Sequence, residues 1–484
     1  MHVILVILHV LYAMLHLGIA YQILMGNRPP AGKLFWMVFT WIPVVGLVFY
    51  LVFGINYRNR KVFSRIHDVP VKRIKDEISP EIAAKLFPKS SYEILGDDYR
   101  PLAHLLEAAG EGNKVYSGNS FEIITGGGRK RELILQDLQN AKRFIHMEYF
   151  KFGNDSSGRE VRDVLIQKAR EGVQVRFLYN SMTMYKYPRS YFRQMREAGV
   201  ELIPYTHIKH GLKSWLMHLN HQNHRKIVII DGEMAYTGGM NLNDNYFYKW
   251  RDTHLRLHGP VIARLQASFT DHWLSMGGDF TSPLPYFFES RYSQLPADPF
   301  RDQTVQIVTD APENAVPATQ MGYEWVLGHA RDYVFIQTPY FTPPEPLLHA
   351  IKAAALRGVD VRISIPRHID APLIGPASHG LFRECLEAGV RIYLRDGAFI
   401  HAKTLVADDS LTIIGASNLD NRSFSINCEV NSFIYGREVA LSYREIFLED
   451  LQEAREIELD AWVKGRKWHQ ELWSRFLLTL QYQF

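Results

Sequence analysis

The chain has 484 residues, of which 47% are hydrophobic and 13% aromatic; this length predicts two domains or a duplicated one, and the composition excludes a disordered or fibrous chain. A formal net charge of +4 gives no global argument for nucleic-acid binding. The two cysteines, Cys385 and Cys428, lack a metal-ligand spacing, which argues against disulfides or structural zinc and predicts reduced thiols in a cytosol-facing domain.

Residues 1–57 contain two apolar runs that predict a pair of transmembrane helices. The first run, residues 3–25, is interrupted only by two histidines and a glutamine, and the second, residues 34–57, has no charged side chain. Because a Gly- and Pro-containing turn sequence lies between them, we expect a helical hairpin rather than a cleaved signal. Two buried core helices are the alternative interpretation.

Basic residues follow the second run between residues 58 and 75 and favour a cytoplasmic location for everything downstream. Arg28 and Lys33 in the preceding loop oppose this orientation. The sequence therefore predicts a multi-pass protein of the cell (cytoplasmic) membrane, with a juxtamembrane linker region at 58–117.

Between residues 120 and 436, approximately, the same order of elements appears twice. A helical pattern at 131–141 precedes a strand pattern at 144–150, and a second helical pattern at 320–330 precedes a strand pattern at 333–338. Strands that alternate with helices predict α/β layers. We expect a first half at 118–300, a second half at 301–460 and an amphipathic tail at 461–484. The tail mixes tryptophans with basic residues, which suits a helix at an anionic interface, although core packing explains it almost as well.

The two halves share one polar constellation. The motif HxK(x4)D occurs twice, followed each time by an asparagine and then by an acid, and every pair is separated by the same 177 positions. The six motif residues form the candidate catalytic set: His224, Lys226, Asp231, His401, Lys403 and Asp408. The downstream residues are Asn241 and Asn418, then Asp252 and Glu429.

Alternation along a strand explains the spacing within each motif. Histidine and lysine at i and i+2 project to the same face of a strand. The apolar residues that follow continue the strand into the core, so Asp231 and Asp408 fall at its far end. Within the candidate set, we therefore expect a structural role for these two aspartates. A single HxK is more often a surface strand, whereas its repetition favours a catalytic site.

The duplicated motif is the signature of the phospholipase D superfamily, and the full layout, including residues 418–424, resembles that of the bacterial cardiolipin synthases. The resemblance implies two α/β halves related by a pseudo-twofold axis, with the active site where their HxK strands meet. It also implies that one phosphatidylglycerol transfers its phosphatidyl group to another, which gives cardiolipin and glycerol without a cofactor or metal.

The residue types suit this chemistry, because an anionic phosphodiester needs charge neutralisation, a nucleophile and an acid for the leaving alkoxide. The resemblance implies that His224 is the nucleophile and His401 the general acid and base, although the repeat itself leaves the reverse open. Both lysines and both asparagines would bind the phosphoryl oxygens. Asp252 and Glu429 would accept the second ring N–H of a catalytic imidazole, unless they are ordinary salt-bridged acids.

Other interpretations remain open at this stage. His218 and His221 precede the first motif but lack a convergent partner, so we expect no metal site there. A phospholipase D that hydrolyses phosphatidyl lipids to phosphatidic acid has the same motifs. A membrane-tethered nuclease lacks support from a dense basic groove, and a non-catalytic scaffold would have degraded motifs. The sequence does not decide between phosphatidylglycerol and phosphatidylethanolamine as acceptor, nor does it give the oligomeric state.

Overall fold

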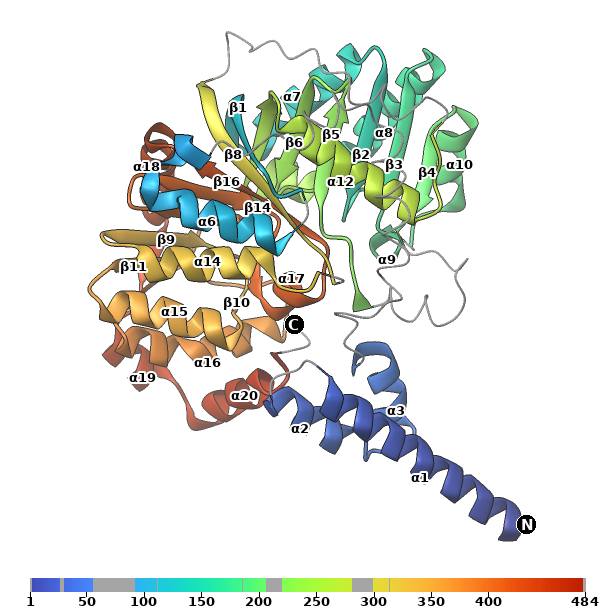
Figure 1. Cartoon of the computed structure of the whole chain (residues 1–484), viewed down its shortest axis with the longest axis vertical. Helices are drawn as coiled ribbons and strands as arrows, with labels where there is room; N and C mark the ends of the chain where they lie inside the picture. Colours follow the sequence, from blue (N-terminus) through green and yellow to red (C-terminus); the bar gives the residue numbers. More distant parts are fainter. Residues whose placement is uncertain are drawn as a thin grey trace.

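The computed structural model describes residues 2–26, 30–54, 92–110, 112–184, 186–205, 220–280, 299–312 and 314–481. The predicted basic segment at 58–75 and His218 lie outside these ranges. Figure 1 shows the amino-terminal helices at one end of the molecule and a large sheet covered by helices at the other.

The amino-terminal apolar runs form α1 (His2–Met25), α2 (Pro30–Phe39), α3 (Val45–Phe49) and the π-helical turn η1 (Tyr50–Gly54). The prediction of a single second helix is wrong, because the chain turns between α2 and α3. Pro43 cannot donate a backbone hydrogen bond there, and Val44 has a positive φ of 61°. Trp36 and Tyr50 are buried against α1 residues Ile19 and Ile23. Within the described residues, no helix combines the length and the apolar character that crossing a membrane requires.

One mixed sheet of 15 strands runs through both halves of the body. Its central pair, β8 and β1, is antiparallel, with Val115 opposite Gln306. Seven strands on each side of this junction follow the same order, and β17 extends one edge. The predicted duplication is therefore confirmed, and the two copies are joined edge to edge. In spatial order the strands are β17 (Ala454–Glu456), β12 (Arg391–Arg395), β11 (Asp360–Pro366), β9 (Tyr333–Gln337), β13 (Thr404–Ala407), β14 (Leu411–Gly415), β16 (Glu429–Tyr435), β8 (Phe300–Asp310), β1 (Val115–Gly126), β7 (Arg251–His258), β6 (Met234–Gly238), β5 (Lys226–Ile230), β2 (Phe144–Tyr149), β3 (Gln174–Tyr179) and β4 (Glu201–Pro204).

Helices cover the sheet, which explains why β5 and β13 are buried along their whole length and apolar after their first residue. The first half carries α7 (Gly127–Asn140), α8 (Ser156–Arg170), α9 (Ser181–Met184), α10 (Arg189–Glu197), η4 (Asn245–Lys249) and α12 (Ile262–Ser275). The second half carries α14 (Ala318–His329), α15 (Glu345–Leu356), α16 (Ile374–Glu387), α17 (Asn421–Ser425) and α18 (Arg437–Leu451), with the small β10 (Phe341–Thr342) and β15 (Leu419–Asp420). Three further helices and a short 3-10 turn complete the described chain: η2 (Tyr92–Leu95), α6 (Gly96–Ala109), α19 (Leu459–Gly465) and α20 (Trp468–Leu478).

The helix α6 packs against the second half, where it buries Leu102 and Leu106 in the core with Tyr323. No equivalent helix covers the first half within the described residues. Both cysteines are buried and free, as the sequence predicted.

The aspartates that end the two motifs lie beyond the last residues of β5 and β13, at the ends remote from the histidines. The Asp231 carboxylate accepts hydrogen bonds from the backbone N–H groups of Lys142, Arg143 and Phe144 at 2.7–2.9 Å. Asp408 accepts the equivalent three from residues 331–333 at 2.8–3.0 Å. Each aspartate thus joins its strand to the preceding helix-to-strand turn. Their φ angles of 56° and 48° are left-handed, a conformation that aspartate tolerates.

Replacing Asp231 by alanine should lower the free energy of unfolding by about 2 to 4 kcal/mol, because three backbone donors lose a charged acceptor. Denaturant unfolding of the detergent-solubilised chain measures the change. Asp231→Asn is the matched control, since it keeps one acceptor oxygen and tolerates the left-handed backbone. An alanine variant as stable as the wild type would contradict the structural role.

Candidate active site

The two motif histidines precede β5 and β13 rather than lying within them, and six strands separate β5 from β13 in the sheet. The HxK strands therefore do not pair in the sheet, although their histidine and lysine ends lie close enough to influence one another's charge. The histidine segments are instead joined by crossed backbone bridges between the halves. His224 N–H donates to the Cys428 carbonyl at 2.9 Å, and His401 N–H donates to the Arg251 carbonyl at 2.7 Å. Each histidine is thus fixed by the first residues of the other half's strand.

The same crossing pairs each imidazole with the carboxylate of the other half. His224 Nδ1 lies 3.0 Å from both Glu429 carboxylate oxygens, and His401 Nδ1 lies 2.8 Å from Asp252 Oδ2. Both acids are fully buried. A proton on Nδ1 donates to the carboxylate and leaves Nε2 as the reactive atom. The sequence predicted these four residues, but not which acid serves which histidine.

The two pairs differ in charge. Burial raises the pKa of Glu429 to about 7, and Lys226 only partly opposes this. Burial also disfavours an ionised Asp252, but Lys403 and His401 outweigh it, so the pKa of Asp252 falls below its ordinary value. Burial and the neighbouring lysines lower the pKa of His224, and burial with Lys403 lowers that of His401 to about 3. The site therefore holds neutral imidazoles, one of them beside an ionised aspartate.

The lysines of the motifs lie in the same buried region. Lys226 Nζ donates to the His224 carbonyl at 2.6 Å, and Lys403 Nζ donates to the His401 carbonyl. Burial lowers the pKa of Lys226 to about 7 and that of Lys403 to about 8, although Glu429 and Asp252 oppose the shift. Each lysine is influenced by acids of both halves, so the two motifs form one electrostatic unit.

The two asparagines have different surroundings. Asn241 accepts from Lys151 N–H at 3.1 Å and donates from Nδ2 to the Tyr246 hydroxyl at 2.8 Å. Tyr246 Oη lies 3.4 Å from His401 Nε2, which links Asn241 to the opposite histidine. The Asn418 Oδ1 atom is buried and has no hydrogen-bond partner among the described residues. An amide at each position can therefore reorient toward a bound anion.

Several residues of the site were not predicted from the sequence. Tyr246 is one of them, although Ser423, the residue 177 positions later, binds the Asn418 N–H at 3.1 Å. The 177-residue spacing pairs a tyrosine with a serine here, so a comparison by residue identity does not find them. Aromatic rings also flank the imidazoles: Phe150 meets His224 edge-on at 4.7 Å, and Trp250 stacks on His401 at 5.1 Å. No spacing rule indicates these rings, which shield the histidines from water.

Arg225, the residue between histidine and lysine in the first motif, stabilises the site through buried hydrogen bonds. Its guanidinium donates to the Glu429 carbonyl at 3.1 Å and contacts His272 Nε2 at 2.8 Å. His272 Nδ1 in turn lies 2.6 Å from Glu148. Beside the other bridge, which joins the His401 segment to Arg251, Asp450 binds Arg251 and Arg395. Both crossings therefore rest on buried, charge-assisted contacts.

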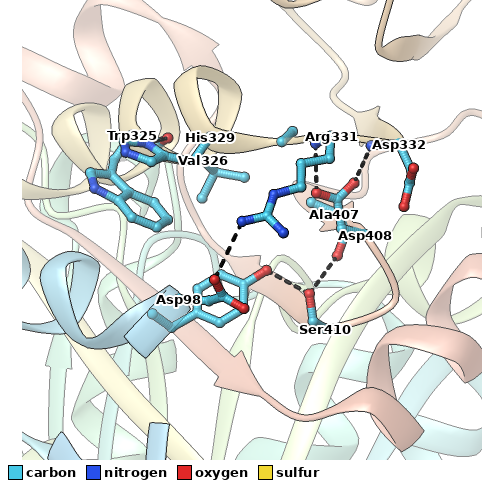
Figure 2. Close-up of a pocket in the computed structure, with 11 residues that line it drawn as sticks. Asp98, Trp325, Val326, His329, Arg331, Asp332, Ala407, Asp408 and Ser410 are labelled. Atoms are coloured by element: carbon cyan, nitrogen blue, oxygen red, sulfur yellow. Dashed lines mark hydrogen bonds and ion pairs between the residues drawn. The ribbon is translucent and has the colours of Figure 1, made fainter. Parts of the chain in front are cut away.

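Two other features lie apart from this chemistry. A cavity of about 300 Å³, lined by Tyr99, Trp325 and Asp408, lies at the end of β13 that is remote from His401. Figure 2 shows Trp325 and Asp408 in this cavity. His221 Nδ1 lies 2.8 Å from the Ile426 carbonyl. The described residues contain no group of three metal-ligating side chains.

The assembled site holds two imidazoles, two amines and two amides at the junction of the halves. It can supply a nucleophile, a proton donor and acceptor, and donors for phosphoryl oxygens.

Comparison with known proteins agrees with this geometry. The family described as "Cardiolipin synthase, PLD-like domain" matches residues 134–273 and 323–451. Cardiolipin synthase of Geobacillus sp. (strain WCH70) is 34% identical over 456 residues, which cover 91% of this chain and 87% of that protein. Cardiolipin synthase 2 of Bacillus anthracis is 34% identical over 461 residues, which cover 92% and 85%.

Among solved structures, phosphatidylserine synthase of Haemophilus influenzae Rd KW20 matches with a TM-score of 0.57 and 15% identity, over 74% of this chain and 92% of that one. This likeness concerns the fold. The sequence matches extend through both halves and carry the family assignment. The chain therefore belongs to the cardiolipin synthase family, with its duplicated phospholipase D-like domain.

Proposed function

We propose that this chain is a membrane-bound cardiolipin synthase that transfers a phosphatidyl group from one phosphatidylglycerol to the free hydroxyl of another. The observation that carries the proposal is the pair of crossed histidine–carboxylate contacts, His224 with Glu429 and His401 with Asp252, beside two buried lysines. The relatives that cover 91% of the chain or more are cardiolipin synthases. Products are cardiolipin and glycerol.

His224 Nε2 attacks phosphorus of the donor lipid, so a P–N bond forms as the bond to the glycerol oxygen breaks. His401 gives its proton to the departing alkoxide, which leaves as glycerol. The acceptor hydroxyl then returns a proton to His401, and its oxygen attacks phosphorus while the P–N bond breaks. The enzyme ends in its starting state, and one phosphodiester has replaced another.

The different charges of the two acids support this assignment of roles. An ionised Asp252 stabilises the imidazolium that His401 must form. The pKa of His401, about 3, rises when an anionic phosphodiester enters, because the anion favours the protonated ring. Lys226, Lys403, Asn241 and Asn418 would bind the phosphoryl oxygens and stabilise the added negative charge of the transition state.

The membrane attachment rests on the apolar surface of α1 and α20. In α1, Met14, Leu17 and Tyr21 expose 64%, 71% and 65% of their surface. In α20, the exposed side chains Trp468, Leu472, Trp473 and Phe476 follow helical spacing. Figure 1 shows α20 at the same end of the molecule as α1 and α2. We propose that these surfaces enter the bilayer of the cell membrane, with the catalytic body on the cytoplasmic side as residues 58–75 predict.

The purified full-length chain in detergent should convert labelled phosphatidylglycerol alone into cardiolipin and glycerol, without added metal or nucleotide. His224→Ala and His401→Ala should each lower kcat at least about 1,000-fold, because a nucleophile or its proton donor is lost. Chromatography of the labelled lipids measures the products. Phosphatidic acid as the main product would replace the synthase proposal with lipid hydrolysis, and adding phosphatidylethanolamine tests the acceptor.

The pH dependence of kcat/KM should separate the two acids. The pKa of Glu429 is about 7, so its carboxylate forms, and activity rises, as pH increases through this value. Asp252 has a lowered pKa and is already ionised there. Glu429→Gln should remove the rising limb near pH 7. Asp252→Asn should lower activity but leave this rising limb in place. Lys226, with a pKa of about 7, and Lys403, with a pKa of about 8, lose their protons as pH increases, so the rising limb should end near pH 7 and activity should fall above it. A rising limb that survives in Glu429→Gln would contradict this assignment.

The double substitution Met14→Arg and Leu17→Arg should move the protein from the membrane pellet to the supernatant after alkaline carbonate washing. Each arginine costs about 3 kcal/mol within a bilayer but almost nothing on a wetted surface. Leu356→Arg is the matched control, since Leu356 is 73% exposed on α15 and should leave the partition unchanged. Retention of the double variant in the pellet would contradict insertion of α1.

A further inference from the structure

A buried lysine and histidine outside the motifs hold the segment that carries Asn241. Lys130, near the start of α7, is fully buried, and its Nζ contacts the Met240 carbonyl at 2.9 Å and the Tyr149 hydroxyl at 3.3 Å. It also lies 3.1 Å from His254 Nε2. The Met240 N–H donates to His254 Nδ1 at 3.3 Å. The pair therefore binds both backbone groups of the residue before Asn241.

The hydrogen-bond pattern fixes the charge of this pair. Because Nδ1 of His254 accepts from Met240, the neutral ring carries its proton on Nε2 and donates it toward Lys130. Lys130 can accept this proton only as an uncharged amine, whose own hydrogens go to Met240 and Tyr149. Burial lowers the pKa of both groups, in agreement with this pattern. A neutral Lys130 also avoids placing a third ammonium near Lys226.

The second half binds the equivalent backbone N–H with a different side chain. The residue 177 positions after His254 is Asn431, which accepts from Ser417 N–H at 3.3 Å and donates to Ser417 Oγ at 2.7 Å. Asn431 also donates to Thr319, near the start of α14, at 3.0 Å. Ser417 precedes Asn418 as Met240 precedes Asn241. An amide and a hydroxyl thus replace the histidine and the lysine.

Glycines at equivalent positions show that both side chains are pressed against the segment. A Cβ at Gly238 would lie 2.8 Å from His254 Nδ1, and one at Gly415 would lie 1.9 Å from Asn431 Oδ1. The contacts are therefore tight in both halves. In each half a polar side chain packs against the segment that carries the asparagine, so this contact is a repeated element of the fold. In the first half that side chain is His254, which can titrate.

We propose that Lys130 and His254 form an uncharged positioning pair that holds Asn241 in place to bind a phosphoryl oxygen. This inference rests on the proposed function and adds two residues to it. Neither side chain touches the reacting atoms. Loss of the pair lets the Met240–Asn241 backbone move, and a displacement of about 1 Å at a binding group can lower kcat about 100-fold.

Substitutions at Lys130 test whether the group must be neutral. Lys130→Gln keeps an uncharged donor and acceptor and should retain kcat for cardiolipin formation within about threefold, which is less than 1 kcal/mol. Lys130→Arg keeps a cation, and Lys130→Met keeps only the length, so each should lower kcat about 10- to 100-fold while KM changes little. An arginine variant as active as the glutamine variant would overturn the neutral pair.

The histidine gives an independent test that does not depend on the folding of the lysine variants. His254→Asn copies the second half and keeps an acceptor for Met240, so it should retain far more activity than His254→Leu. Thermal unfolding of each variant in detergent identifies those that have lost the fold. Equal activity of the two variants at equal stability would overturn the proposal.

A matched control is Lys168→Met, which removes another largely buried lysine; Lys168 lies on α8 and donates to the Gln139 carbonyl of α7 and to the Glu171 carboxylate. Its kcat should equal that of the wild type. The wild-type assay separates the two proposals, because a wild type without cardiolipin formation rejects the proposed function itself. Wild-type synthesis with unchanged Lys130→Met and His254→Leu variants rejects only the positioning pair.

Discussion

The site depends on one constraint: each motif histidine is held by the half to which it does not belong. Backbone bridges bring His224 to the start of β16 and His401 to the start of β7. The acids at those two strand starts, Glu429 and Asp252, then accept the imidazole protons. Neither half contains both members of a motif-histidine–carboxylate pair, so the antiparallel junction of β1 with β8 and the buried networks around Arg225 and Asp450 also support the chemistry.

Burial makes this arrangement responsive to charge. Two lysines, two acids and two histidines are nearly inaccessible to water, and removing one partner of a buried charged pair typically costs about 3 to 5 kcal/mol. The two halves differ in the charge of their buried acid. Asp252 stays ionised beside Lys403, whereas Glu429 has a pKa of about 7 and is poised to change charge. A fold that is symmetric in its backbone therefore contains two unequal histidines, as the proposed transfer through a covalent intermediate requires.

The sequence predicted the duplication and the motif residues because one spacing of 177 recurs in both halves. It did not predict the crossing, since a spacing along the chain cannot tell whether Asp252 meets His224 or His401. Tyr246 shares the spacing but pairs with a serine rather than another tyrosine, so identity alone hides it. Trp250 and Phe150 contact the histidines through ring packing, and no regular spacing in the sequence indicates such contacts. At the amino terminus, hydropathy predicted apolar helices but missed the break at Pro43, where a backbone donor is lacking.

The crossed site has a consequence for how such a chain arises. A half of this kind made as a separate polypeptide would complete its histidine–carboxylate pair only against a second copy, and its activity would fall with dilution. Joining two copies in one chain replaces that association with a fixed local concentration. It also frees each copy from symmetry, because a substitution in one no longer appears in the other. The two copies differ in this way: Glu429 in one corresponds to Asp252 in the other, and Asn431 with Thr319 corresponds to His254 with Lys130. Such divergence is what a fusion permits.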